Sequence, residues 1–263
     1  IAIMTFFGGI FLGQESGFGS LQSYLLFIIA VIALGLFIMV ERKRKSPLIK
    51  FAIFKNKIFT LSLLSAVLIF ASNFFVNVVI PFYLQDARKL SASYAGLLMM
   101  VFPLLMVVGA PLSGYLTDKI GPGILTFGGL LLLCCTSLMY MFLDMNSPIW
   151  YYVIATAIMG LGNALFQSPN NTMVMSSVEK QDLGVAGSMN SFARNLGMVI
   201  GIALSTTILY RGMSEAYGER VTTYLANRPD IFIVGMRETF FVAFLLCVAA
   251  FILTILRFRK TTK

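Results

Sequence analysis

The sequence has 263 residues, of which 58% are hydrophobic and only 12% are charged, and its mean hydropathy is +0.87. Soluble domains have a charged share of about a quarter, so the composition excludes an ordinary soluble domain and indicates an integral membrane protein. The net charge of +9 comes from basic residues in short breaks between apolar runs. Because these residues form no single face or stripe, we expect no nucleic-acid partner.

Apolar runs long enough to cross a bilayer, which takes about 20 residues, recur along the chain. The first run, Ile1–Gln14, predicts the end of a helix, so we expect further sequence upstream, and a Gly-rich turn follows at Gly13–Gly19. Seven complete spans are predicted after it: Leu21–Val40, Ile58–Leu84, Ser93–Thr117, Gly123–Leu143, Pro148–Gln167, Gly184–Tyr210 and Thr239–Leu256. The predicted fold class is therefore an all-α polytopic membrane protein.

Most basic residues lie in alternate loops, on the side that holds the segment Glu41–Lys57 and the tail with Arg257, Arg259, Lys260 and Lys263. By the positive-inside rule this side is cytoplasmic, so we expect a cytoplasmic C-terminus in the cell membrane and an external Gly13–Gly19 turn. We divide the chain into extra helices (1–40), a basic cytoplasmic linker (41–57) and a six-helix bundle (58–263). Such a bundle suggests half a transporter made of two inverted three-helix repeats, with Ile58–Leu84 and Pro148–Gln167 equivalent, although other polytopic proteins share these features.

A short loop between the second and third spans of the six-helix block carries the most informative motif, Gly114-Tyr-Leu-Thr-Asp118-Lys119-Ile-Gly121. An Asp here can accept hydrogen bonds from the N-terminus of a neighbouring helix, where the helix dipole favours an anion. On chemistry alone, an ordinary turn with one acidic and one basic residue explains the segment equally well.

This loop resembles the G-x-L-x-D-[RK]-x-G signature of the major facilitator superfamily, in the weaker copy of the C-terminal half. The matching residues are Gly114, Leu116, Asp118, Lys119 and Gly121. Pro122 and Gly123 replace basic residues that are common in the stronger copy. The resemblance implies that Asp118 helps latch the two transporter halves together on the cytoplasmic side.

Three further stretches, Gly160–Asn163, Pro169–Asn171 and Leu183–Gly197, resemble the fourteen-helix drug:proton antiporter family. Members of that family carry two extra helices between their halves, the place that residues 1–40 occupy here. The resemblance implies alternating access that moves small amphipathic or cationic substrates against protons. The implied partners are the lipid bilayer and the missing N-terminal half of the same chain.

Arg194 lies ten residues into the predicted span Gly184–Tyr210, about 15 Å from its start. A buried Arg costs roughly 2.5–3.5 kcal/mol in a membrane, so it should face a partner or a cavity, and we add it to the candidate gating residues. The alternative is that the helix starts earlier and the side chain reaches the cytoplasmic surface. Small residues at every fourth position predict a packing face: Ala193, Gly197, Gly201 and Ser205.

The resemblance also implies that the first and fourth helices of the block line the central cavity. Both carry polar residues one turn apart, next to aromatic residues in the first: Phe70, Asn73, Phe74, Asn77, Asn163 and Gln167. Neutral amides beside aromatic rings suit amphipathic or cationic aromatic ligands, so these six are the candidate substrate-binding residues. Hydrogen bonding between helices by Asn and Gln is an equally good explanation.

The residues that several classes of enzyme require are absent from this sequence. It contains no histidine and no phosphate-binding G-x-x-x-x-G-K-[ST] motif, so we expect neither catalysis nor a metal or cofactor, and the proton gradient as the energy source. Asp86, Asp144 and Glu238 lie near span ends, so a coupling carboxylate would lie in the missing half. The predicted function is proton-coupled drug efflux. The alternatives are a major facilitator symporter or importer of a small metabolite, and a seven-helix receptor or sensor.

Overall fold

The computed structural model describes residues 4–9, 12, 21–43, 51–225 and 228–258 of a chain with two compact units, Ile1–Ala52 and Ile53–Lys263. In the first unit, residues 4–9 are helical and pack against α2 (Leu21–Lys43). The rings of Phe6 and Phe27 meet edge to face with centroids 5.7 Å apart. The unit boundary falls inside the predicted basic linker. The predicted turn at 13–19 and residues 44–50 of the linker lie outside the described residues.

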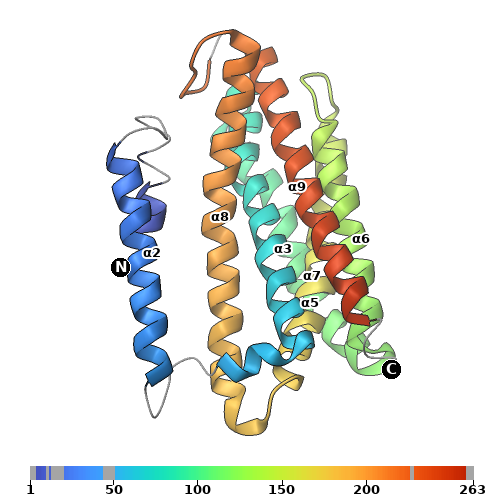
Figure 1. Ribbon diagram of the computed structural model, residues 1–263. Coiled ribbons are helices and arrows are strands. Elements are labelled where there is room, and N and C mark those ends of the chain that lie inside the picture. Colours follow the sequence, from blue (N-terminus) through green and yellow to red (C-terminus); the bar gives the residue numbers. More distant parts are fainter. Residues whose placement is uncertain (1–3, 10–11, 13–20, 44–50, 226–227, 259–263) are drawn as a thin grey trace. The chain divides into compact units, whose positions relative to one another are not determined.

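The second unit is a helical bundle (Figure 1). Its elements in chain order are η1 (Phe51–Lys55), α3 (Lys57–Pro81), η2 (Phe82–Ala87), α4 (Ala92–Met99), α5 (Val101–Ile120), α6 (Pro122–Met141), α7 (Ile149–Ser176), η3 (Lys180–Asp182), α8 (Leu183–Tyr217) and α9 (Pro229–Phe258). Among the described residues, six helical segments are long and apolar enough to cross a membrane, and they match the six spans predicted in this region. No strand occurs in the described part of the chain, so the predicted all-α polytopic fold class is confirmed.

Helix ends in the bundle follow from local chemistry. The side chain of Asn56 accepts hydrogen bonds from the backbone N–H groups of Ile58 and Phe59 and so caps the start of α3. Between α5 and α6 the backbone turns at Gly121, whose φ of +87° is a conformation that L side chains rarely adopt. Pro122 follows as the first residue of α6, where its missing N–H costs nothing. The last glycine of the signature loop therefore makes a sharp corner.

The two three-helix repeats are interleaved. α3 packs mainly against α8 and α9, whereas α7 packs mainly against α5 and α6. Each of these helices is the first of its repeat, and each packs against the second and third helices of the other repeat. The two run in opposite directions along the bundle (Figure 1). This exchange of partners is the arrangement expected of two inverted repeats.

Small residues bring α8 close to α3. The predicted packing face of α8 is buried throughout: Ala193, Gly197, Gly201 and Ser205. A Cβ atom at Gly197 would lie 2.9 Å from Cβ of Phe70, and one at Gly201 would lie 2.9 Å from Cβ of Phe74. Because such contacts require the backbones to move apart, the packing face predicted from sequence is confirmed.

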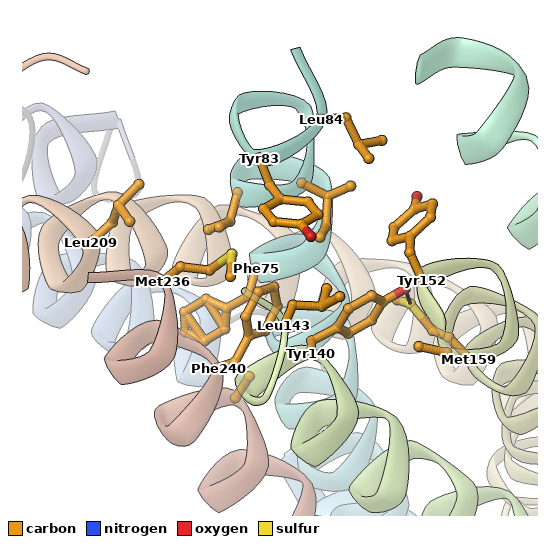
Figure 2. Packing of buried hydrophobic residues seen from close by; sticks show 14 of the residues in the cluster. Phe75, Tyr83, Leu84, Tyr140, Leu143, Tyr152, Met159, Leu209, Met236 and Phe240 are labelled. Carbon is orange, nitrogen blue, oxygen red and sulfur yellow. Dashed lines mark hydrogen bonds between the residues drawn. The ribbon is translucent and has the colours of Figure 1, made fainter. Parts of the chain in front are cut away.

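A buried core with several aromatic residues joins α3, α6, α7 and α9, as Figure 2 shows from close by. The rings of Tyr140 and Phe240 stack with centroids 5.1 Å apart, and the Tyr140 hydroxyl shares a 2.9 Å hydrogen bond with Thr156. Nearby, the hydroxyl of Tyr83 donates to the backbone carbonyl of Asp144 at 2.7 Å. This bond ties the end of α3 to the α6–α7 loop. We call this end of the bundle the α6–α7 end and the opposite one the C-terminal end.

The Asp144 carboxylate orders the α6–α7 loop. It accepts hydrogen bonds from the Ser147 hydroxyl at 3.0 Å and from the Asn146 backbone N–H at 2.8 Å. The hydroxyl, followed by the backbone N–H, lowers the pKa of this carboxyl below its usual value, because both stabilise the charged form. The loop contacts are therefore kept as long as the carboxyl is ionised.

Several helices extend beyond the spans predicted from hydropathy. α7 continues past Gln167 to Ser176, α8 continues to Tyr217, and α9 begins at Pro229, ten residues before Thr239. At 30 residues α9 is about 45 Å long, whereas the hydrocarbon core of a bilayer is about 30 Å thick. Polar or charged residues end an apolar window without ending the helix, which is why sequence analysis made these helices too short.

Candidate functional site

Two polar side chains from equivalent helices meet in the middle of the bundle. Asn73 of α3 donates from Nδ2 to Oδ1 of Asn163 on α7 at 2.5 Å, and Asn163 donates back from Nδ2 to Oδ1 of Asn73 at 3.1 Å. The second N–H of the Asn163 amide reaches the Met159 carbonyl at 3.0 Å. The exposed fraction is 7% for Asn73 and 0% for Asn163. The structure thus makes the interhelical bond considered from sequence, and substrate contact by either residue stays a prediction.

A partly exposed stripe of α3 lies beside this amide pair. Phe70 and Phe74 are half-buried at the contact with α8, and Asn77 is exposed, with its Nδ2 donating to the Asn73 carbonyl at 3.2 Å. One turn further along, Pro81 has no N–H to give to the Asn77 carbonyl, and the helix passes into the π-helical turn η2. Of the predicted binding residues on α3, these three are the ones whose side chains remain accessible in this chain.

Asn77 also lines a cavity of about 220 Å³ between α3, the α4–α5 junction and α7. The lining residues are Val76, Asn77, Ile80, Met99, Phe102, Pro103, Tyr152, Thr156 and Met159. Apolar and aromatic side chains dominate, with an amide, a hydroxyl and a phenol as polar groups. This composition is typical of small-molecule sites, in which a few polar groups orient a mostly apolar ligand.

Gln167, the last predicted binding residue, lies four residues after Asn163 on α7 and is half-buried. Within the described residues, its side chain makes no hydrogen bond. Hydrogen bonds therefore link Asn73, Asn77 and Asn163, and within the described residues none of them includes Gln167.

Arg194 stands beside the predicted binding residues. It lies eleven residues after the start of α8 at Leu183, about 16 Å along the helix. Its side chain is exposed in this chain, and its guanidinium carbon is 6.0 Å from the centroid of the Phe70 ring. The ring face attracts a cation at this distance. The helix start agrees with the sequence expectation, and the gating role of Arg194 stays a prediction.

The signature loop lies at the C-terminal end of the bundle. Asp118 and Lys119 are both exposed in the last turn of α5, and the Lys119 ammonium lies 4.6 Å from the centroid of the Tyr115 ring. Within the described part of the chain, Asp118 makes no hydrogen bond or salt bridge. A Cβ atom at Gly114 would contact the Ser168 hydroxyl at 3.7 Å, an ordinary separation. Of the two glycines at the ends of the signature loop, backbone geometry thus requires Gly121 and not Gly114. The latch role of Asp118 stays a prediction.

A second polar cluster at the C-terminal end was missed from sequence, which placed Arg257 in the cytoplasmic tail. Arg257 instead belongs to α9 and is 2% exposed. Its Nη1 donates to the Ser62 hydroxyl at 2.8 Å and to Oδ1 of Asn170 at 3.2 Å, and Asn170 donates to the Ser62 carbonyl at 3.3 Å. These bonds hold the end of α9 to α3 and α7.

A repeating pattern in α7 could have predicted these clusters. Thr156, Asn163 and Asn170 are spaced by seven residues, which places them on one helix face. All three are buried, and each bonds to another helix. The pattern identifies the face, but no local feature names the partners, because those lie far away in the sequence.

Comparison with known proteins identifies the family. The sequence profile of the Major Facilitator Superfamily matches residues 1–202 and, in an overlapping match, residues 63–263. The chain belongs to the major facilitator superfamily. It is 29% identical over 236 residues to the riboflavin transporter RibZ of Clostridioides difficile, covering 90% of this chain and 50% of that protein.

Two other relatives are named as multidrug proteins. The chain is 29% identical over 219 residues to the multidrug transporter protein MdtP of Bacillus subtilis, covering 82% of this chain and 40% of that protein. It is 25% identical over 202 residues to the multidrug resistance protein Stp of Mycobacterium tuberculosis, covering 77% of this chain and 37% of that protein. The chain thus spans half or less of the length of these curated relatives. Its family and the six apolar helices found among the described residues make it part of a multi-pass membrane protein. The transporter names of these relatives agree with the expectation that it is not an enzyme.

Proposed function

We propose that the intact transporter exports amphipathic or cationic drugs in exchange for protons, by alternating access of two helix bundles. The observation that carries this proposal is the wall of the 220 Å³ cavity beside α3, which is lined by the neutral amide of Asn77 and by the rings of Phe102 and Tyr152. Flat apolar ligands suit such a wall, because ring stacking and a few hydrogen bonds bind many shapes. The names of MdtP and Stp agree with it.

The protein would belong to the fourteen-helix antiporter family, with residues 1–40 as the extra helices. It would lie in the cell membrane with its C-terminus in the cytoplasm. The described carboxylates of the six spans lie towards the helix ends, such as Asp118 in the last turn of α5 and Glu238 in the third turn of α9. This placement supports a coupling carboxylate in the other half of the intact protein.

Arg194 favours a second candidate, transport of an uncharged aromatic metabolite. Arg194 is exposed, and its guanidinium lies near the ring of Phe70, on the same helix as the cavity-lining Asn77, so it would repel a cationic ligand and tolerate a neutral one. Riboflavin, which RibZ is named for, is such a ligand. The two candidates share a cavity and differ in the charge of the substrate.

Reconstitution of the intact transporter into liposomes separates these candidates. With an imposed proton gradient, we expect a cationic dye to be transported and the pH of the vesicle interior to change in proportion to the amount of dye transported. Matched vesicles receive riboflavin instead of the dye. Gradient-dependent transport of riboflavin alone would favour the second candidate, and no gradient-dependent transport of either would refute the proposed function.

A further inference from the structure

A second cavity, separate from the substrate wall, opens at the α6–α7 end between α6, α8 and α9. Its volume is about 740 Å³, and its lining residues are Met141, Ile208, Arg211, Glu215, Arg237, Glu238, Phe241 and Val242. None of these residues lines the cavity beside Asn77. Four of them are charged and four are apolar, so the cavity is amphipathic.

The two kinds of lining residue are separated along the helices. On α8 the apolar stretch ends at Tyr210 and Arg211 follows, and on α9 the charged pair Arg237 and Glu238 directly precedes the apolar stretch that begins at Thr239. In a helix that crosses a bilayer, such a change marks the level where hydrocarbon meets headgroups. The cavity therefore straddles this level, with its charged part towards water and its apolar part towards the acyl chains.

Two of the four charged lining residues form a salt bridge with each other, and the other two are Arg237 and Glu238. Nε of Arg211 donates to Oε1 of Glu215 at 2.7 Å, so the charges of these two residues offset each other. Arg237 and Glu238 are both exposed and, within the described residues, make no hydrogen bond or salt bridge. Glu238 also lies close against α8, because a Cβ atom at Gly212 would be 2.5 Å from its Oε2 atom. The cavity thus offers one guanidinium and one carboxylate to a ligand.

We propose that this cavity binds a phospholipid with a primary ammonium headgroup, such as phosphatidylethanolamine. The guanidinium of Arg237 donates to the lipid phosphate, for which its planar fork is suited, and the lipid ammonium donates to the carboxylate of Glu238. One acyl chain lies along Ile208, Phe241 and Val242. The zwitterion brings an opposite charge to both groups at once, whereas a ligand with a single charge brings one to only one of them, so the zwitterion is the best match. The proposal requires only that the chain is embedded in a membrane and does not depend on the transported substrate.

The proposal can be tested by native mass spectrometry of the intact transporter, purified in detergent and titrated with one lipid at a time. For the wild type we expect phosphatidylethanolamine to bind more tightly than phosphatidylcholine, whose quaternary ammonium cannot donate a hydrogen bond, or phosphatidylglycerol, which has no ammonium. Arg237→Gln should weaken binding of phosphatidylethanolamine by about tenfold, since a hydrogen bond between charged groups is lost. Glu238→Gln should invert the selectivity in favour of phosphatidylglycerol, because the carboxylate no longer repels the anionic lipid.

A matched control is available on the same end of the bundle. Arg228 is exposed, pairs with Asp230 at 2.9 Å and does not line the cavity, so Arg228→Gln should leave lipid binding unchanged. Equal binding of the three lipids by the wild type, or equal effects of Glu238→Gln and Arg228→Gln, would overturn the proposal. A dimer that covers this face and dissociates in the Arg237 and Glu238 variants would overturn it as well. Lipid binding is measured without substrate, so its outcome is independent of the transport assay.

Discussion

The amide pair Asn73–Asn163 makes a quantitative prediction. Replacing Asn163 by Leu removes both bonds between the two amides and the bond to the Met159 carbonyl, and leaves the buried Asn73 amide without this partner. Such a change costs about 1–3 kcal/mol. Interhelical hydrogen bonds in membranes contribute about 0.6 kcal/mol on average and up to about 1.7 kcal/mol each, so two bonds should couple the residues by about 1–3 kcal/mol. The Asn73→Leu/Asn163→Leu double variant should therefore be much more stable than the sum of the single effects predicts.

The thiol of Cys247 can report unfolding, because it is buried at 1% exposure. With the other cysteines replaced, the free energy of unfolding of the intact transporter follows from the rate of maleimide labelling in a denaturant series. Asn77→Leu is the matched control, since its exposed amide bonds only within its own helix. A coupling energy below about 0.5 kcal/mol in the double-mutant cycle would show that the two amides do not stabilise each other, and the geometry would then be wrong.

Three further predictions concern transport and topology. Asn77→Ala removes about 0.5–1.5 kcal/mol of hydrogen bonding and should weaken drug affinity about 2- to 12-fold, whereas Phe74→Ala should affect bulky aromatic drugs most. Proton coupling, measured as drug-induced proton release, should survive both changes. Loss of coupling at unchanged drug affinity would contradict the assignment of these residues to the binding site. Asp118→Asn should slow transport while leaving insertion and ligand binding intact, and wild-type turnover would return the loop to an ordinary turn. A single Cys at exposed Glu219 should react with an impermeant thiol reagent in intact cells and one at exposed Lys180 should not; the reverse pattern would contradict the orientation.

Sequence and structure agree best where a property depends on neighbouring residues. The six spans of the bundle, the start of α8 and the packing face at Gly197 and Gly201 all follow from hydropathy or from residue spacing within one helix. The interhelical hydrogen bonding considered for the polar residues of α3 and α7 occurs between Asn73 and Asn163. What spacing could not supply was the partner of each face.

The remaining differences have the same physical origin. Arg257 and Ser62 come from opposite ends of the bundle sequence, so no local pattern predicts that they bond, and hydropathy alone assigned Arg257 to the tail. Arg194 was expected to need a partner, yet only the approach of α8 to α3 identifies the Phe70 ring. The early start of α9 was missed because the hydropathy window was ended at the charged pair Arg237 and Glu238, although the helix continues through the apolar residues Ile231–Met236 before it.

The interleaved packing of the repeats also has a consequence for biogenesis. α3 is the first helix of the bundle to be synthesised, but its principal neighbours α8 and α9 are the last, so most of its contacts join residues far apart in sequence. Until α7 arrives, the Asn73 amide has no interhelical partner and must remain in lipid or in contact with the insertion machinery. Assembly of the bundle is therefore a late and slow step, as expected where long-range contacts dominate. Ribosomes stalled before α7 should leave a chain that is inserted but still sensitive to proteases.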